Sequence, residues 1–317
     1  MVKNSIYSAG RFRLMGSVIL MALILVWGIC VSRCTRTDEM ERLRSEIAQY
    51  IDDKDARIGV AVIFDCRDTV SVRGNEAFPM LSVYKFPQAL AIAEMMQQGA
   101  LSLSDSVFIS YAEMNADTWS PMRDKYGVKD MRLPFSELLA YTLQQSDNNA
   151  CDVLFKTIGA PQMVEKYLRE NGFMDIHIKS TEDEMHRDLT LCYANNSTPL
   201  DMARLLDRFC TQLRDSTEIY SYIGQMMEEC ATGTDRLARP LAGSGAMIGH
   251  KTGSGDRNAD GRIIGINDCG YVLLPYGRRY TIAVFVSDIA GEASEASEII
   301  AGISEIVYNF ALMNRSP

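Results

Sequence analysis

Ser82-Val-Tyr-Lys85 stands where the hydrophobic pattern of this 317-residue chain changes from strands to helices. Before it, the apolar run from Ile58 to Phe64 is followed by turn residues and by Thr69 to Val72, a pattern typical of a β-hairpin. After it, helical periodicity predicts helices over residues 86–96, 135–143, 149–155, 161–170 and 199–213. The chain therefore passes at this point from a sheet into a helical region.

Strand patterns return after residue 245. They cover residues 246–252, 262–267, 271–274 and 280–287, and Pro275-Tyr276-Gly277 joins the last two. Helical periodicity lies outside the strands at both ends of the chain, over 39–51 and over 293–312. Strands at both ends with helices between them most simply form one antiparallel sheet.

This order predicts an α/β (α+β) fold with two parts, an antiparallel sheet flanked by helices and an all-helical lobe. We place the sheet domain at residues 39–80 and 240–317 and the helical lobe at residues 81–239. A cleft between the two parts is the expected position of a small-molecule site.

The first 34 residues have the order of an export signal. Lys3, Arg11 and Arg13 precede an uncharged apolar stretch of 19 residues from Leu14 to Ser32. That length is at the border between a long signal sequence and a membrane-spanning helix. We expect residues 1–34 to be a signal peptide, with a retained membrane anchor as the alternative. The globular part is then expected outside the cytoplasm, in the periplasm.

The composition excludes several classes of protein. A chain with 47% hydrophobic and 23% charged residues is neither collagenous nor disordered. The net charge of -9 disfavours nucleic acid as a partner, because phosphate backbones would be repelled. The cysteines beyond the export signal are sparse and irregularly spaced, so we expect buried thiols with any disulfide optional. Zinc has little support, because no Cys-x-x-Cys is present and the three histidines are scattered.

The Ser82–Lys85 pair has the residue types of an activated nucleophile. A spacing of three places both side chains on one face of a helix. A serine hydroxyl is a weak nucleophile unless a neighbouring group accepts its proton, and a partly desolvated lysine amine can do so. About one Ser-x-x-Lys is expected by chance in a chain of this length, so alone the pair is equally a first-turn serine with an exposed lysine.

Two further triplets strengthen the signal. Ser146-Asp147-Asn148 lies between two predicted helices, and Lys251-Thr252-Gly253 lies on a predicted strand of the second half. A specified tripeptide is expected by chance only about 0.04 times in such a chain. The three motifs come from a helix start, a loop within the lobe and the sheet edge, so they can meet only at the cleft.

With these three motifs the sequence resembles the class A serine β-lactamases, from roughly residue 40 to the C-terminus. A fourth element, Thr181-Glu-Asp-Glu-Met-His186, is similar to the omega loop of that family. The resemblance assigns the glutamate that activates hydrolytic water to Glu182, with Glu184 as the alternative. His186 stands where most of the family has Asn, which resembles the extended-spectrum, cephalosporinase-leaning branch.

The resemblance implies a reaction through a serine acyl-enzyme, with penicillins and cephalosporins as substrates and no metal or organic cofactor. The implied catalytic residues are Ser82, Lys85, Ser146 and Glu182. Either Lys85, or Glu182 through a water, is implied as the base that takes the serine proton, and this alternative stays open. Ser146 would relay a proton to the lactam nitrogen, and the backbone N–H groups of Ser82 and Ser254 would hold the oxyanion.

The resemblance also implies a set of substrate-binding residues: Asn148, Lys251, Thr252, Ser254, Trp119 and Arg236. Asn148 would bond the acylamide side chain, and Lys251, Thr252 and Ser254 the carboxylate. Trp119 resembles an aromatic residue at the cleft rim, although a half-buried aromatic before a turn fits nearly as well. Arg236 resembles an arginine that this branch supplies to the substrate carboxylate. His250 precedes Lys251 on a strand, so alternation points it to the opposite face, where we expect a structural role.

Two other functions remain as alternatives. A penicillin-binding D-alanyl-D-alanine peptidase shares the three motifs, and β-lactams trap it as a long-lived acyl-enzyme. A membrane-anchored β-lactam sensor also acylates without turnover, but the 13 residues before the apolar stretch are too few for an output domain. We expect a monomer whose partner is a small-molecule β-lactam and which contacts a membrane only if residues 1–34 are retained.

Overall fold

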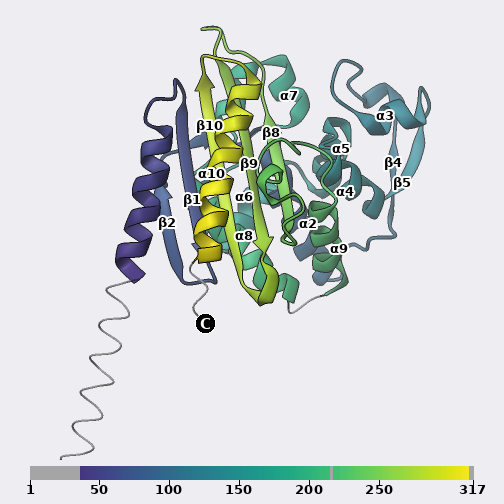
Figure 1. The fold of residues 1–317 in the computed structure, drawn as a ribbon. Helices are drawn as coiled ribbons and strands as arrows, with labels where there is room; N and C mark the ends of the chain where they lie inside the picture. The colour runs from purple at the N-terminus through teal and green to yellow at the C-terminus, as the bar shows by residue number, and fades with distance from the viewer. Residues whose placement is uncertain (1–35, 215–216, 314–317) are drawn as a thin grey trace, which may run out of the picture.

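The computed structural model describes residues 36–214 and 217–313 (Figure 1). The expected signal peptide or anchor at residues 1–34 therefore lies outside the described residues. Within them the chain begins with a helix over residues 36–51, which confirms the helix expected there. The six described cysteines are free thiols, and four of them are buried.

The central element is an antiparallel five-stranded sheet in the order β2-β1-β10-β9-β8. Its strands are β1 (Arg57–Phe64), β2 (Asp68–Val72), β8 (Met247–Ser254), β9 (Ile263–Leu273) and β10 (Arg279–Ile289). The two ends of the chain meet inside it, because β1 pairs with β10 from Arg57 opposite Ser287 to Phe64 opposite Tyr280. The predicted fold class is confirmed.

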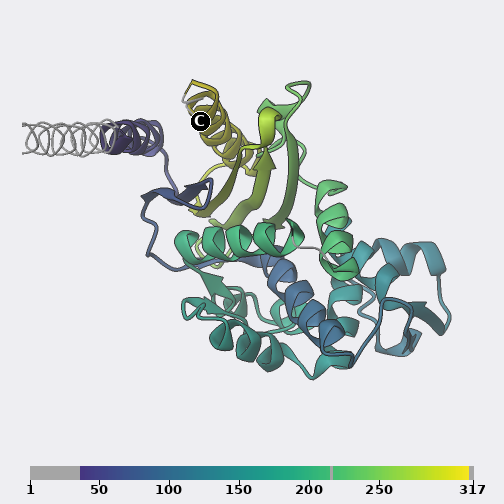
Figure 2. The ribbon, with the colours of Figure 1, turned by 90° about the horizontal axis from the view of Figure 1, so that it is seen from below.

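Helices cover both faces of the sheet, because its central strands are apolar on both sides. Seven of the eight β1 residues are buried. Residues 36–51 and α10 (Ala293–Met313) pack on one face, and α8 (Pro199–Arg214) packs on the other. Figure 2 shows the sheet as a layer between α10 and α8, with α2 and other helices of the lobe beyond α8.

The second half of the sheet differs from prediction at one strand. The two short strands expected at 262–267 and 271–274 are one continuous strand, β9. The intervening Asp268-Cys269-Gly270 has the composition of a turn, yet all three residues are buried. Asp268 bonds to His250 on the neighbouring strand, and Gly270 fits against that side chain, so tertiary contacts keep the segment extended.

The helical lobe is assembled around α2 (Lys85–Gln97), whose first nine residues are all buried. Around it lie α3 (Pro121–Tyr126), α4 (Phe135–Gln144), α5 (Asn148–Ile158), α6 (Pro161–Glu170), α7 (Glu182–Arg187) and α9 (Glu218–Glu228). Two small antiparallel sheets join β3 (Phe78–Pro79), β7 (Asn196–Ser197) and β6 (Ile176–His177), and β4 (Ser106–Ile109) with β5 (Met131–Pro134). The helices expected at 86–96, 135–143, 149–155, 161–170 and 199–213 are confirmed, whereas α3, α7 and α9 were not predicted.

The lobe and the sheet share a hydrophobic core. One cluster of buried side chains runs from Leu90 and Ile92 of α2 through Leu206 of α8 to Ala283 and Phe285 of β10. The domain boundaries expected at residues 81 and 239 stay a prediction. The shared core nevertheless holds the lobe firmly against the sheet where the motifs meet.

Candidate active site

A turn of 3-10 helix, Leu81–Tyr84, presents Ser82 immediately before α2. Because a 3-10 helix has about three residues per turn, Lys85 stands directly over Ser82. The Lys85 Nζ atom donates a hydrogen bond to Ser82 Oγ at 2.9 Å. Leu81 has a φ of +48°, a left-handed conformation that is uncommon for a non-glycine residue and concentrated at functional sites.

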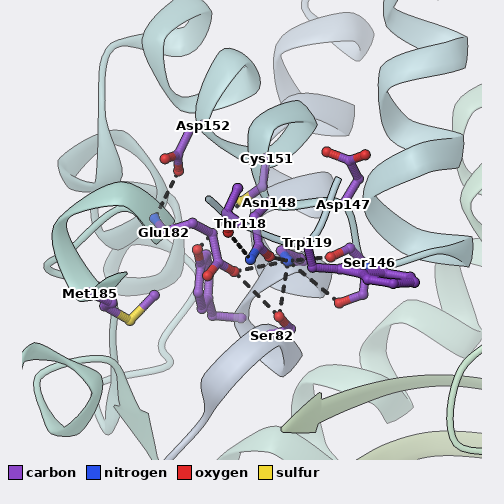
Figure 3. Close-up of polar contacts among 12 residues, drawn as sticks. Ser82, Thr118, Trp119, Ser146, Asp147, Asn148, Cys151, Asp152, Glu182 and Met185 are labelled. Carbon is purple, nitrogen blue, oxygen red and sulfur yellow. Dashed lines mark hydrogen bonds and ion pairs between the residues drawn. The ribbon is translucent and has the colours of Figure 1, made fainter. Parts of the chain in front are cut away.

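The Lys85 ammonium is fully buried and surrounded by acceptors. It donates to the Ser146 carbonyl at 2.8 Å and to Asn148 Oδ1 at 2.7 Å, and its ion pair with Glu182 Oε1 is 2.9 Å long. A buried charge destabilises a fold unless it is paired and hydrogen-bonded, and this one is both. Figure 3 shows the side chains of Ser82, Ser146, Asn148 and Glu182 gathered around this point.

The structure separates the two candidate glutamates of α7. The Ser82 hydroxyl donates to Glu182 Oε1 at 3.3 Å. Glu184 instead accepts from the Thr181 backbone nitrogen at 2.9 Å and completes a capping box at the start of α7. Its side chain is thus engaged at the helix end, away from the serine. Of the two glutamates, Glu182 is the one that faces Ser82.

Asp152 on α5 positions Glu182 and was not predicted. Its two carboxylate oxygens accept hydrogen bonds from the backbone nitrogens of Glu182 and Asp183, each at 2.8 Å. Burial, with the nearby Glu182 carboxylate, raises the pKa of Asp152 to about 7. No motif in the sequence marks this residue. A signal was present only in its spacing, four residues after Asn148 and therefore one turn along the same helix.

Ser146 links the helical lobe to the edge of the sheet. The Lys251 Nζ atom donates to Ser146 Oγ at 3.0 Å, and Lys85 Nζ lies 3.4 Å from the same oxygen. Lys251 is fully buried, and this burial lowers its pKa to about 8. Ser146 has a φ of +57°. The hydroxyl is therefore held between two lysine side chains by a strained backbone.

The other two residues of the second motif fix the loop that faces the serine. Asp147 caps α5 and accepts hydrogen bonds from the Met122 nitrogen at 2.7 Å and from Ser120 Oγ at 3.0 Å. Asn148 Nδ2 donates to Thr118 Oγ1 at 2.8 Å. Thr118 therefore sets the orientation of the Asn148 amide, and sequence reasoning had missed it.

Gly253 brings the third motif up to the serine. A Cβ atom on Gly253 would lie 2.5 Å from the Met80 carbonyl oxygen and 3.3 Å from the Ser82 nitrogen. Because glycine lacks that atom, the edge strand β8 can approach the turn that carries Ser82. Ser254 follows on β8 and lines the same pocket as Ser82.

Arg236 lies behind the third motif with its guanidinium group buried. It donates to the Gly253 and Asn267 carbonyls at 3.0 and 2.9 Å and to Ser254 Oγ at 2.7 Å. Within the described ranges no carboxylate forms an ion pair with it. A buried cation bonded to neutral groups can therefore attract an anionic ligand.

A pocket opens over these groups. The described residues that line it are Leu81, Ser82, Thr118, Asn148, Glu182, Met185, His186, Leu189, Cys192, Ser254, Gly255 and Asp256. Trp119 is outside this set. Its indole nitrogen donates to the Gln145 carbonyl at 2.8 Å, and the side chain is 61% exposed. It was expected at the rim, and it follows the lining residue Thr118 directly.

Comparison with known proteins gives a consistent result. The model of the β-lactamase enzyme family matches residues 42–311. A β-lactamase of Bacteroides uniformis is 37% identical over 90% of this chain and 97% of its own. The crystal structure of the TLA-1 extended-spectrum β-lactamase superposes with a TM-score of 0.83 at 36% identity, covering 86% of this chain and 99% of the other. A class A β-lactamase from Bacteroides cellulosilyticus superposes with a TM-score of 0.82 at 35% identity, covering 87% and 99%.

Proposed function

The chain belongs to the β-lactamase enzyme family and is a class A serine β-lactamase that hydrolyses β-lactams, and we propose that Ser82 is its nucleophile. The observation that carries this proposal is the position of the Lys85 ammonium, which contacts both Ser82 Oγ and Glu182 Oε1. One buried cation thus joins a hydroxyl that can attack a carbonyl to a carboxylate that can activate water.

In the acylation step, Ser82 Oγ attacks the lactam carbonyl carbon and the C–N bond of the ring opens. The serine hydroxyl donates to Glu182, while Lys85 donates to the serine oxygen. This direction of hydrogen bonding favours Glu182 over Lys85 as the base. Ser146 gives its proton to the departing lactam nitrogen and regains one from Lys85, which in turn recovers the serine proton from Glu182 and leaves that carboxylate ionised.

The oxyanion of the acylation step is bound by backbone N–H groups of Ser82 and Ser254. The close approach of Gly253 to the Ser82 nitrogen supports this assignment, because it brings the two segments together. Loss of one such donor typically lowers the rate by about 10²- to 10³-fold.

In the deacylation step, Glu182 removes a proton from water, which attacks the acyl carbonyl and releases Ser82. The backbone nitrogens of Glu182 and Asp183 donate hydrogen bonds to Asp152, and these bonds keep the Glu182 carboxylate in place. Deacylation distinguishes a β-lactamase from a penicillin-binding peptidase or a sensor, and the match to the β-lactamase family agrees with it.

The substrate carboxylate binds at Lys251, Thr252 and Ser254, and Arg236 adds its positive charge through Ser254. Asn148 binds the acylamide side chain. Cephalosporins, including extended-spectrum ones, are the preferred substrates. This preference is supported by the 36% identity to TLA-1, which is described as an extended-spectrum enzyme. Comparison of kcat/KM for benzylpenicillin and a series of cephalosporins tests it.

Steady-state hydrolysis of nitrocefin by the purified protein is the direct test of the reaction. We expect many turnovers per enzyme molecule and no activity in Ser82→Ala. A single stoichiometric burst followed by a stable acyl-enzyme would instead identify a peptidase or a sensor.

The chain acts in the periplasm. This part of the proposal rests on the export pattern of residues 1–34 and on the substrate, which is met outside the cytoplasm. N-terminal sequencing of the protein recovered from a periplasmic extract tests it. Cleavage near residue 34 would support a signal peptide, and an intact N-terminus in the membrane fraction would support an anchor.

A further inference from the structure

A cluster of titratable side chains lies outside the pocket described above. Its members are Cys230, His250 and Asp268, from the segment after α9, from β8 and from β9. None of the three is among the described residues that line the pocket with Ser82. His250 is 3% exposed and Asp268 is fully buried, whereas Cys230 is partly exposed, so the cluster runs from the protein interior toward the surface.

The His250 ring is held between a carboxylate and a thiol. Its Nδ1 atom lies 2.9 and 3.0 Å from the two carboxylate oxygens of Asp268. Cys230 is the second hydrogen-bonding partner of the His250 side chain. Gly270 pairs with His250 across the two strands, and a Cβ atom there would lie 2.7 Å from His250 Cβ. The sheet is therefore shaped to hold this ring.

The charges of the cluster follow from its contacts. Burial disfavours the imidazolium form, but the Asp268 carboxylate outweighs this effect and raises the pKa of His250 to about 10. Burial also disfavours the thiolate form of Cys230, but the hydrogen bond and charge of His250, with the charge of Lys251, lower its pKa to about 7. These contacts favour a thiolate facing an imidazolium.

Cys230 reaches the third motif by two routes. Its Sγ atom lies 3.4 Å from Thr232 Oγ1, and that hydroxyl lies 2.5 Å from Thr252 Oγ1. The second route is electrostatic. Burial lowers the pKa of Lys251, and the negative charge of the Cys230 thiolate raises it again. Of the charges that act on Lys251, Cys230 has the largest effect. The other charged groups facing this region are Lys85 from α2, Glu182 from α7, Arg236, and Glu228 at the end of α9.

We propose that Cys230, His250 and Asp268 form a thiolate–imidazolium–carboxylate chain that keeps Lys251 in its ammonium form and holds Thr252 in place through Thr232. Cys230 and His250 are positioning residues, since they act through Lys251 and Thr252 and not on the substrate. The inference rests on the proposed function, in which Lys251 binds the substrate carboxylate.

The pH dependence of kcat/KM tests the electrostatic route. In the wild type we expect kcat/KM to fall as pH rises through about 8, the lowered pKa of the buried Lys251. We expect Cys230→Ser to move this alkaline limb about one pH unit toward acid, mainly through KM, because serine keeps a hydroxyl but carries no charge. Cys230→Asp restores a negative charge and should return the limb toward its wild-type position. Cys66→Ser, at an exposed cysteine on the β1–β2 turn, is the matched control and should leave the profile unchanged.

The thiolate can also be observed without any substrate, by its ultraviolet absorbance. We expect an absorbance that rises with a midpoint near pH 7, is lost in Cys230→Ser and His250→Gln, and persists in Cys66→Ser. If Cys230→Ser fails to fold, the wild-type titration and His250→Gln still decide the question.

Three results would overturn the inference: no thiolate titration near neutral pH, a Cys230→Ser profile that superimposes on the wild type, or equal shifts in Cys230→Ser and Cys230→Asp. The last would mean that Cys230 acts through packing. A wild-type KM in Lys251→Gln would overturn the role of Lys251 itself, while the thiolate titration would still report on the cluster.

Discussion

Two glutamates that are two residues apart in α7 face different parts of the molecule. Glu182 Oε1 lies 2.9 Å from Lys85 Nζ and 3.3 Å from Ser82 Oγ. Glu184 bonds the Thr181 backbone and caps its own helix. A carboxylate that is engaged in a cap has no route to an acyl group on Ser82. The chemistry of α7 therefore depends on Glu182.

We expect Glu182→Gln to acylate more slowly than the wild type, at a still measurable rate, and to stall before deacylation, because an amide accepts a proton neither from the serine nor from water. The loss in turnover should be about 10²- to 10⁴-fold. Mass spectrometry of the intact protein after mixing with nitrocefin would show the trapped acyl-enzyme. Glu184→Gln is the matched control, since glutamine also completes a capping box, and it should turn over normally. Normal turnover in Glu182→Gln with stalling in Glu184→Gln would contradict the assignment.

The residues that sequence reasoning found and missed differ in the kind of signal they carry. Ser82, Ser146 and Lys251 stand in motifs with fixed spacing, so their chemistry could be predicted before their positions were known. Asp152 and Thr118 act by bonding one backbone segment or one side chain each. Such contacts depend on how distant segments pack, and the sequence around a single polar residue on a helix or loop contains no pattern that predicts them.

At the level of elements, the contact between α5 and α7 sets the geometry of the site. α7 has six residues, too few to hold a fixed orientation by itself. Asp152 on α5 accepts hydrogen bonds from the two backbone nitrogens at the start of α7. The carboxylate of Glu182 is thus positioned by α5, the helix that begins at Asn148 of the second motif.

We expect Asp152→Ala to slow deacylation by about 10²-fold, because a shift of about 1 Å in a catalytic group costs that much. Acylation should fall less, so the acyl-enzyme should accumulate in single-turnover kinetics. Asp188→Ala is a matched control at the other end of α7, where the carboxylate bonds the Thr190 backbone nitrogen at 2.9 Å. Equal deacylation rates in Asp152→Ala and the wild type would show that α7 is held by other contacts.

Strand β9 and helix α9 show how packing overrides local signals. Asp268 and Gly270 were interpreted as a break between two strands, yet the His250 side chain requires both a carboxylate and an empty space there. In α9, the spacing of Ile219, Tyr220, Ile223 and Met227 is helical, but Gly224 interrupts it. A Cβ on Gly224 would lie 2.8 Å from Leu213, so close helix packing explains this glycine.

Gly270→Ala should therefore destabilise the protein although alanine is otherwise tolerated in buried strands. Its Cβ would lie 2.5 Å from the Gly249 carbonyl oxygen and 2.7 Å from His250 Cβ, so the two strands must move apart. Overpacking of this kind typically costs about 1–3 kcal/mol. Thermal unfolding followed by circular dichroism measures the loss. An unchanged Tm would mean that β8, as the edge strand, moves without resistance.

At the scale of the whole molecule, segments that are far apart in the sequence pack side by side. The helical lobe is inserted between strands that pair with each other, since β1 and β10 lie side by side although about 220 residues separate them. One buried cluster contains Leu90 of α2 and Phe285 of β10. Separating the lobe from the sheet would expose apolar surface on both, at about 25 cal/mol per Å².

We therefore expect the lobe and the sheet to unfold together. In native-state hydrogen exchange at increasing urea, the most protected amides of α2 and β10 should converge on one opening free energy. Leu90→Ala in the lobe should lower the protection of β10 as much as that of α2, by about 2–5 kcal/mol. Val284→Ala, on the face of β10 that packs against α10, should likewise lower the protection of α2. If α2 opened at lower urea than β10, and Leu90→Ala affected α2 alone, the shared core would not couple them, and the cleft would lie between two independently stable units.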